Sequence, residues 1–230
     1  MIAEIKAVAR SHLATDGANL SLRAVARDMG MVSSALYRYF PSRDDLLTAL
    51  ILDAYDALGD AVQAADSAIT DRTLLRVRWL SSGHAVRDWA LAAPAEYALI
   101  YGSPVPGYAA PSDTTVAATR VPEVLLGILT DGCASGVLPA KPVVPLAARA
   151  DARTSAQLRS ELAIARDAIA PGLPDYLFQA AMTSWVQLFG IVSFELFGQF
   201  NNVIGARAEF FTGQLELMAD LMGLSGDQAL

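Results

Sequence analysis

Cysteine and histidine are scarce in this chain of 230 residues, which has one cysteine and two histidines. The single cysteine, Cys133, cannot form a disulfide within the chain or supply a cysteine cluster for zinc. The histidines, His12 and His84, are far apart in the sequence, so a histidine-rich metal site is not expected either. We therefore expect no metal and no other cofactor. This cysteine usage is typical of a reducing compartment and predicts a cytoplasmic protein.

Signals for enzymatic chemistry are also missing. The chain has no serine, histidine and acid at a catalytic spacing and no glycine-rich phosphate loop. Two histidines can supply little acid–base chemistry. We therefore do not expect an enzyme. Membership of the disordered class is excluded as well, because 53% of the residues are apolar and only 18% are charged.

Positive charge is unevenly distributed along the chain, whose net charge is −7. The first 45 residues hold six basic and five acidic side chains, whereas the other 185 hold 11 basic and 19 acidic ones. The net charge argues against non-specific binding of the whole chain to nucleic acid. An acidic body attached to a neutral or slightly basic head instead indicates two separate tasks.

Strand-like alternation of apolar and polar residues is nearly absent, and alanine and leucine dominate, so the sequence predicts an all-α fold. Ser21 and Ser42 are suited to cap the second and fourth helices, and Gly30 interrupts the chain between the second and third. Long loops are expected at 102–116 and 136–150. The helices are expected at about 5–16, 21–29, 33–40, 42–65, 71–92, 94–101, 120–135, 152–168, 175–199 and 204–222.

One segment, residues 176–194, has no charged side chain and is long enough to span a membrane. It contains two glutamines and two serines, which are unfavourable in lipid, and Glu195 follows at once. We therefore favour a buried or subunit-interface helix and expect no membrane partner. A helical protein that binds lipid or a membrane surface stays open as the alternative.

Two short helices that meet at a glycine form a helix-turn-helix pattern near the amino end. In the third helix Leu36 and Phe40 are four residues apart, so both should pack inward. This leaves Ser33, Ser34, Tyr37 and Arg38 for a partner. A helix presented in this way fits the major groove of DNA, which is wide enough for one α-helix.

Residues 21–47 resemble the DNA-binding head of the TetR family of bacterial repressors, with the hallmark LYRYFPSR at 36–43. The similarity covers about residues 5–50. Val32 stands where a capping serine is common in that family, so Ser33 could take this role. The resemblance implies a helix-turn-helix DNA-binding domain at 1–47 and a helical ligand-binding and dimerisation domain at 48–230.

The resemblance also assigns roles to individual residues of the head. It implies that Tyr37, Arg38, Tyr39 and Arg43 hold phosphates and that Arg23 lies near the groove. Base-edge contacts are implied for Ser33, Ser34 and Ala35. Two structural alternatives stay open: the two tyrosines could be core aromatics, and the arginines could be ordinary solvated charges.

The body is similar to the WHG-like subgroup of TetR C-terminal domains, on the stretches 89–108 and 185–198. The family implies that the last two long helices form a four-helix bundle between two subunits, and we assign Phe194 and Phe197 to that interface. It also implies an effector cavity, although aromatic residues at helical spacing are more often core. The candidate lining residues are Trp79, Trp89, Tyr97, Tyr101, Phe178, Met182, Trp185 and Phe189.

Together these features predict a cytoplasmic homodimeric transcriptional regulator. We expect a repressor that binds a near-palindromic operator in double-stranded DNA and is released by a small apolar effector. The alternative is a helical small-molecule or lipid-binding protein that does not bind DNA.

Overall fold

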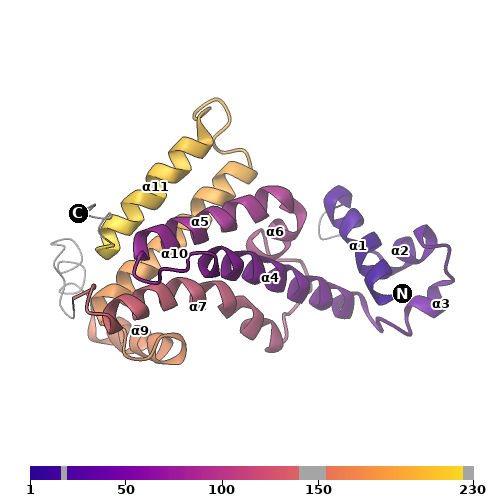
Figure 1. Cartoon of the computed structure of the whole chain (residues 1–230). Helices are drawn as coiled ribbons and strands as arrows, with labels where there is room; N and C mark the ends of the chain where they lie inside the picture. Colours follow the sequence, from indigo (N-terminus) through magenta and orange to yellow (C-terminus); the bar gives the residue numbers. More distant parts are fainter. Residues whose placement is uncertain (17–19, 140–153, 225–230) are drawn as a thin grey trace. The chain divides into compact units, whose positions relative to one another are not determined.

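The computed structural model describes residues 1–16, 20–139 and 154–224, and within these ranges the regular structure is α-helix only (Figure 1). The all-α prediction is thus confirmed. The helices are α1 (Ile2–Asp16), α2 (Leu22–Asp28), α3 (Ser33–Leu36), α4 (Arg43–Ser67), α5 (Leu75–Ala92), α6 (Pro94–Tyr101), α7 (Asp113–Ala134), α9 (Ala156–Ile169), α10 (Asp175–Leu196) and α11 (Arg207–Met222).

Helix α7 begins at Asp113, inside the predicted loop 102–116 and well before the predicted start at residue 120. At the start of the helix, the hydroxyl of Thr114 donates to the carbonyl of Pro111 at 2.7 Å. Thr114 and Ala117 are both buried, so packing overrides the low helix propensity of the β-branched residues in this stretch. The prediction of a loop over 113–116 was wrong for this reason.

Helix α3 ends at Leu36, although the periodicity predicts a helix as far as Phe40. Residues 37–39 form a turn in which the amide of Tyr39 donates to the carbonyl of Leu36 at 2.9 Å. Pro41 disfavours a helical conformation in the residue before it, which explains the early end.

Smaller differences concern the other helix ends. Helix α5 begins at Leu75 rather than 71, α10 ends at Leu196 rather than 199, and α11 begins at Arg207 rather than 204. In the predicted loop 136–150, residues 136–139 are non-helical and the remainder lies outside the described residues. The start of the helix predicted over 152–168 also lies outside them, and α9 is described from Ala156.

The chain divides into two compact units. Unit 1 contains Met1–Gly59 and Trp89–Ala118, and unit 2 contains Asp60–Asp88 and the described part of Thr119–Leu230. The divisions fall inside α4, α5 and α7. The division predicted at residue 47 follows the DNA-binding motif rather than compactness, and it stays a prediction.

The core of unit 1 contains residues of α1, α2, α3 and the first turns of α4. Val105, which follows α6, packs into the same core. Helix α1 packs against α2 and α6, and α2 packs against α3. The apolar residues recur every three or four positions, which places them on one face of each helix. Buried together are Ile5, Ala9, Leu13, Leu20, Leu22, Val25, Ala26, Leu36, Phe40, Leu46, Leu47, Leu50 and Val105.

The turn between α2 and α3 depends on Gly30, whose φ is +66°. Its amide donates to the carbonyl of Arg27 at 3.0 Å, and the amide of Met31 donates to that of Ala26 at 2.8 Å. This pair of bonds satisfies the last carbonyls of a helix when a left-handed residue follows it. Glycine adopts that conformation without the steric penalty of a side chain, so the turn redirects the chain into α3.

Both predicted serine caps are confirmed. The Ser21 hydroxyl accepts the amide of Ala24 at 3.4 Å at the start of α2. At the start of α4, the Ser42 hydroxyl accepts the amide of Asp45 at 3.1 Å, while the Ser42 amide donates to the Asp45 carboxylate at 2.9 Å. These reciprocal bonds fix the first turn of α4 and therefore the end of the helix-turn-helix.

Unit 2 is organised around α10, which packs against α9 and α11 (Figure 1). Half-buried or buried side chains occupy most of its length, and Glu195 near its end is 9% exposed. The two carboxylate oxygens of Glu195 accept hydrogen bonds from Arg87 on α5 at 2.8 and 2.7 Å. By length and composition α10 could cross a membrane. These contacts pack it within unit 2, and the prediction was a buried or subunit-interface helix.

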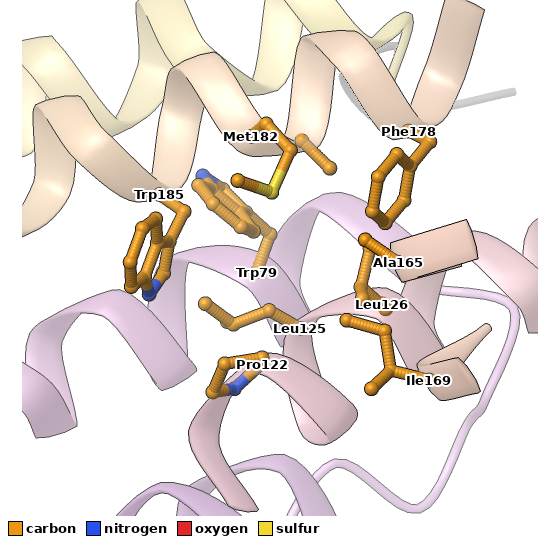
Figure 2. Close-up of a pocket in the computed structure, with 10 residues that line it drawn as sticks. Trp79, Pro122, Leu125, Leu126, Ala165, Ile169, Phe178, Met182 and Trp185 are labelled. Carbon is orange, nitrogen blue, oxygen red and sulfur yellow. The ribbon is translucent and has the colours of Figure 1, made fainter. Parts of the chain in front are cut away.

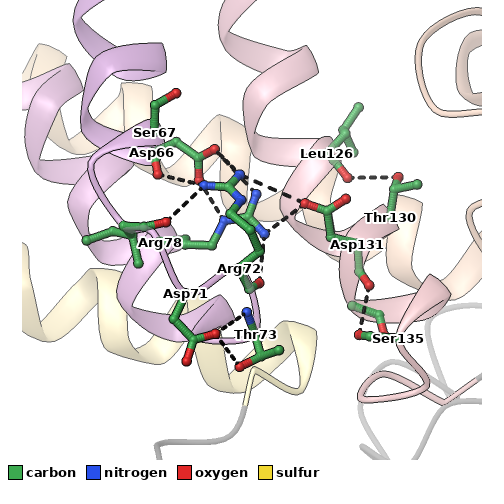
Figure 3. Close-up of polar contacts among 12 residues, drawn as sticks. Asp66, Ser67, Asp71, Arg72, Thr73, Arg78, Leu126, Thr130, Asp131 and Ser135 are labelled. Carbon is green, nitrogen blue, oxygen red and sulfur yellow. Dashed lines mark hydrogen bonds and ion pairs between the residues drawn. The ribbon is translucent and has the colours of Figure 1, made fainter.

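A partly buried ion cluster joins the end of α4 to α5 and α7 within unit 2 (Figure 3). The side chain of Arg78 is 1% exposed, and it donates to Asp66 at 2.8 Å and pairs with Asp131 at 2.8 Å. Arg72 also pairs with Asp66. Burial acts to raise the pKa of Asp66, but the hydrogen bonds from the two arginines outweigh it and hold that pKa below the ordinary value of 3.8.

Candidate nucleic-acid interface and ligand cavity

Residues 33–40, here called the recognition segment, bury apolar side chains on one face and expose polar ones on the other. Leu36 is fully buried and Phe40 is buried in the core of unit 1, which holds the segment in place. Tyr37 and Tyr39 are each 41% exposed. The alternative that these tyrosines are core aromatics is therefore wrong, and both are accessible to a partner.

Small side chains lie at the front of the recognition segment. Ser34 is exposed, and Ser33 and Ala35 are half-buried. Val32 precedes them as the N-cap residue and makes no side-chain capping bond, and Ser33 is the first helical residue rather than the cap. The short side chains allow the backbone of α3 to approach a flat or grooved surface closely.

The predicted arginines differ in how they are held. The side chains of Arg23 and Arg38 are exposed and have no ion-pair or hydrogen-bond partner among the described residues. Arg43 is half-buried: its Nε donates to the carbonyl of Leu20 at 3.2 Å, and its Nη1 lies 3.7 Å from Asp44. Unit 1 therefore presents two unpaired cations and one oriented cation beside the recognition segment.

One side-chain hydrogen bond ties the first two helices of unit 1 together. The Nε2 atom of His12 on α1 lies 2.7 Å from the carboxylate of Asp28 at the end of α2. This hydrogen bond holds the pKa of Asp28 below its ordinary value of 3.8. The pair orients α2, which packs on α3.

Unit 2 contains a cavity of about 200 Å³ between α5, α7, α9 and α10 (Figure 2). All its described lining residues are apolar or aromatic. They are Trp79, Pro122, Leu125, Leu126, Ala165, Ile169, Phe178, Ala181, Met182 and Trp185. Cavities with this lining bind small apolar molecules.

Two tryptophans line this cavity, and their indole N–H groups differ. Nε1 of Trp79 donates to the carbonyl of Leu215 on α11 at 3.1 Å. Nε1 of Trp185 is also shielded from solvent, yet it has no hydrogen-bond partner in the described part of the chain. The two tryptophans therefore differ in whether the protein satisfies their N–H groups.

Of the eight side chains expected to line a cavity, four do so and four do not. Trp79, Phe178, Met182 and Trp185 line the cavity of unit 2. Phe189 is buried beside Trp185, with ring centres 5.9 Å apart, but it does not line the cavity. The remaining three belong to unit 1: Trp89 is half-buried, and the tilted rings of Tyr97 and Tyr101 have their centres 5.1 Å apart. Burial raises the pKa of Tyr101 far above its ordinary value.

Six lining residues were not predicted from the sequence, and all of them are aliphatic or proline. Pro122, Leu125 and Leu126 come from α7, Ala165 and Ile169 from α9, and Ala181 from α10. Aliphatic residues on one face of a helix have the same sequence pattern whether they fill a core or line a cavity. Among the described residues no group of three or more histidine, cysteine or acidic side chains could hold a metal ion.

Comparisons with known proteins agree with this arrangement. Residues 5–50 match the family model described as bacterial regulatory proteins of the tetR family. Residues 79–218 match the model described as the tetracyclin repressor-like C-terminal domain. The HTH-type transcriptional regulator Rv1816 of Mycobacterium tuberculosis is 40% identical over 202 residues, which are 86% of this chain and 81% of that protein.

Solved structures give the same result. A regulatory protein named SCO4313 is 36% identical, with a TM-score of 0.73 over 96% of this chain and 95% of the other. A bacterial regulatory protein of the tetR family from Rhodococcus RHA1 shares the fold at 15% identity, with a TM-score of 0.61 over 96% of each chain. With its helix-turn-helix and its matched C-terminal domain, the chain belongs to the TetR family of transcriptional regulators.

Proposed function

We propose that this regulator is a repressor that binds a near-palindromic operator as a homodimer and leaves it when a small apolar effector enters unit 2. The observation that carries this proposal is the recognition segment, where Leu36 and Phe40 are buried while Tyr37 and Arg38 are exposed. Such a segment has its outer face available for the major groove. A head at 1–47 for DNA and a body at 48–230 for effector and partner belong to the same proposal.

Roles for the individual residues follow from their chemistry and exposure. Base edges would be contacted by Ser33, Ser34 and Ala35, since short side chains let the backbone of α3 enter the groove. Phosphates would be held by Tyr37, Arg38, Tyr39 and Arg43, with Arg23 near the groove. Phosphate contacts fix the register of a protein on DNA, whereas base contacts select the sequence.

The homodimer is proposed to form through α10 and α11. These helices pack against each other and expose large apolar side chains that a monomer would leave in water. Val186 is 60% exposed, Phe194 is 52% and Leu217 is 58%. A second copy of the same surface would cover them. In the proposed dimer, the two heads bind half-sites about one helical turn of DNA apart, roughly 34–36 Å.

The effector site is proposed to be the cavity of unit 2. Trp79, Phe178, Met182 and Trp185 would contact the effector there, whereas Trp89, Tyr97, Tyr101 and Phe189 would act only from outside this cavity. Trp79 follows Arg78, which is bonded to Asp66 near the end of α4. Helix α4 also supplies Leu46 and Leu47 to the core of unit 1, so a shift of Trp79 could be passed to the head through one continuous helix.

A cytoplasmic location and the absence of enzymatic activity complete the proposal. Both are supported by the relatives, which are named as transcriptional regulators. An effector needs to favour the non-binding conformation by only about 1–3 kcal/mol for a useful response.

A gel-shift assay with DNA from upstream of the chain's own gene tests the proposal. The folded chain should retard this fragment, and competitor DNA of unrelated sequence should not displace it. A double variant, Tyr37→Ala with Arg38→Ala, is the matched control, because both side chains are exposed and their loss should leave the fold intact. A folded dimer that fails to retard the fragment at low salt would contradict the proposal.

A further inference from the structure

We infer that Val32 is a specificity-determining residue of the DNA interface and that it reads thymine, whose C5 methyl group its side chain contacts in the major groove. This inference rests on the proposed function and deepens it. Val32 directly precedes the recognition segment and joins the base-reading residues there. Each half-site of the operator then has to contain a thymine at the position that Val32 faces.

Val32 occupies a position where the neighbouring helices of unit 1 use serine. It is the N-cap residue of α3, as Ser21 is for α2 and Ser42 is for α4. Both serine hydroxyls accept a backbone amide, whereas α3 has no side-chain capping bond. Apolar residues are among the weakest N-caps, so valine makes α3 less stable than serine would. Capping therefore does not account for this residue.

Packing does not account for it either. Val32 is 71% exposed, and its backbone is extended, with φ −70° and ψ 137°. Leu36, four residues further on, is fully buried in the core of unit 1, whereas Val32 lies outside that core. Exposed valines are common on protein surfaces, and exposure alone assigns no role. A residue that weakens its own helix, in the part of the fold that meets DNA, breaks a local rule at a functional site.

The position of Val32 is one that meets base edges. In a helix-turn-helix, the first residues of the recognition helix contact the bases in the major groove. Val32 directly precedes the first helical residue, Ser33, and its carbonyl accepts the amide of Ala35 at 2.9 Å. Between residues 31 and 36, the exposed side chains are those of Val32 and Ser34. Val32 is therefore held at the front of α3 and is open to a partner.

The chemistry of this front turn favours one base. Residues 31–36 contain no arginine, lysine, asparagine or glutamine, which are the side chains that pair with guanine or adenine at two points. Serine hydroxyls bond to several bases and discriminate little between them. An apolar side chain offers no hydrogen bond, but thymine alone presents a methyl group in the major groove. Contact with that methyl group is the base recognition available to Val32.

Uracil in place of thymine isolates the methyl group, since both bases pair with adenine in the same way and differ only at C5. The duplex is the inverted repeat selected from random DNA with the full chain. Each thymine of its half-sites is replaced in turn by deoxyuridine, and fluorescence anisotropy gives the affinities. At one position, replacement in one half-site should weaken binding by about 3- to 5-fold, the effect of burying one methyl group. Replacement in both half-sites should weaken it by about 10- to 25-fold.

Two exposed valines of unit 1 provide a variant and its matched control. Val32→Ser should abolish the difference between thymine and uracil, while its hydroxyl caps α3 and raises the melting temperature by about 2–4 °C. Loss of recognition together with a gain in stability separates base reading from a structural role. Val32→Ala should lose the difference without gaining a cap. Val116→Ser, at a residue of α7 that is 73% exposed, should leave the difference unchanged.

Equal affinities for the thymine and uracil duplexes at every position of the half-sites would overturn the inference. So would a selected repeat without thymine in its half-sites, or a thymine preference that persists in both Val32→Ser and Val32→Ala. The unmodified chain decides the first two outcomes alone, even if a variant does not fold. In all three cases the chain still binds its operator, so the proposed function stands. A chain that enriches no sequence would reject the proposed function, and the inference would fall with it.

Discussion

Arginine has opposite surroundings in the two units. In unit 1 the side chain of Arg38 is exposed and has no partner among the described residues. In unit 2 the side chain of Arg78 is 1% exposed and is bonded to Asp66 and Asp131. A cation left unpaired on the surface is available for another molecule, whereas a cation enclosed by carboxylates holds helices together. The proposed function assigns recognition to Arg38, whereas Arg78 links helices of unit 2.

The largest expected effect is on stability and follows from Arg78, the buried cation of unit 2. Replacing Arg78 with methionine removes two hydrogen bonds from the buried Asp66 and leaves it only the partly exposed Arg72 as a partner. Breaking a buried ion pair in this way should lower the free energy of unfolding by about 3–5 kcal/mol. Urea denaturation followed by circular dichroism measures it. Arg38→Met is the matched control and should change stability by less than about 0.5 kcal/mol, because the side chain is exposed.

The same cluster predicts sensitivity to acid. The pKa of Asp66 is held below its ordinary value of 3.8, so its contribution to stability is fully present above that value. This contribution is lost as the pH falls from there through the lowered pKa of the folded state. Unfolding curves should therefore show a loss of stability below about pH 4. A double variant in which Asp66 and Arg78 are both apolar should lack this component; an unchanged acid profile would argue against the cluster.

The next largest effect concerns Arg38, the unpaired cation of unit 1. Arg38→Ala should weaken DNA binding by about 2 kcal/mol, or about 30-fold, through the loss of a charge-assisted contact to phosphate. The loss should be similar for specific and unrelated DNA, and the dependence of affinity on salt should become shallower. Fluorescence anisotropy at several salt concentrations measures both quantities. A variant that binds DNA as tightly as the unmodified chain would remove Arg38 from the interface.

Ser34, at the front of the recognition segment, extends the comparison to the selection of DNA sequence. Ser34→Ala should change the preference for one base position by about 1 kcal/mol, while total affinity for unrelated DNA stays nearly constant. Competition with operator variants that carry single substitutions measures this preference. An unchanged base preference would place Ser34 outside the base-reading set.

Ser21 provides the smallest expected effect. Its hydroxyl caps α2 at 3.4 Å, which is long for a hydrogen bond. Ser21→Ala should therefore cost about 0.5 kcal/mol of stability, the low end of the range for lost N-caps, and leave base preference unchanged. Both serines are exposed, so thermal unfolding of Ser21→Ala and Ser34→Ala side by side isolates the contribution of the capping bond.

The two units also differ in how far they could be predicted. In unit 1 the spacing of Leu36 and Phe40, the glycine at 30 and the caps at 21 and 42 fix both the helices and the exposed face. Such features act over a few residues, so the sequence reports them directly. The early end of α3 escaped prediction because the pattern of buried residues continues through a turn that is not helical.

In unit 2 the cavity depends on contacts between helices that are far apart in the sequence. Aromatic residues at helical spacing identify buried faces but do not tell which faces meet, so Trp79 and Trp185 were grouped with Tyr97 and Tyr101 of unit 1. The partner of the Trp79 N–H is a backbone carbonyl at Leu215, which has no sequence signature. The contrast between the two indoles therefore emerges only from the packed structure.

Selection from a random duplex library with the full chain tests the central claim most directly, namely that the recognition segment reads DNA. Sequencing of the bound fraction should give an inverted repeat whose half-sites lie about one helical turn, 10–10.5 base pairs, apart. The enrichment should vanish in the double variant Tyr37→Ala with Arg38→Ala. A folded chain that enriches no sequence at low salt, or a double variant that enriches the same repeat, would contradict the account.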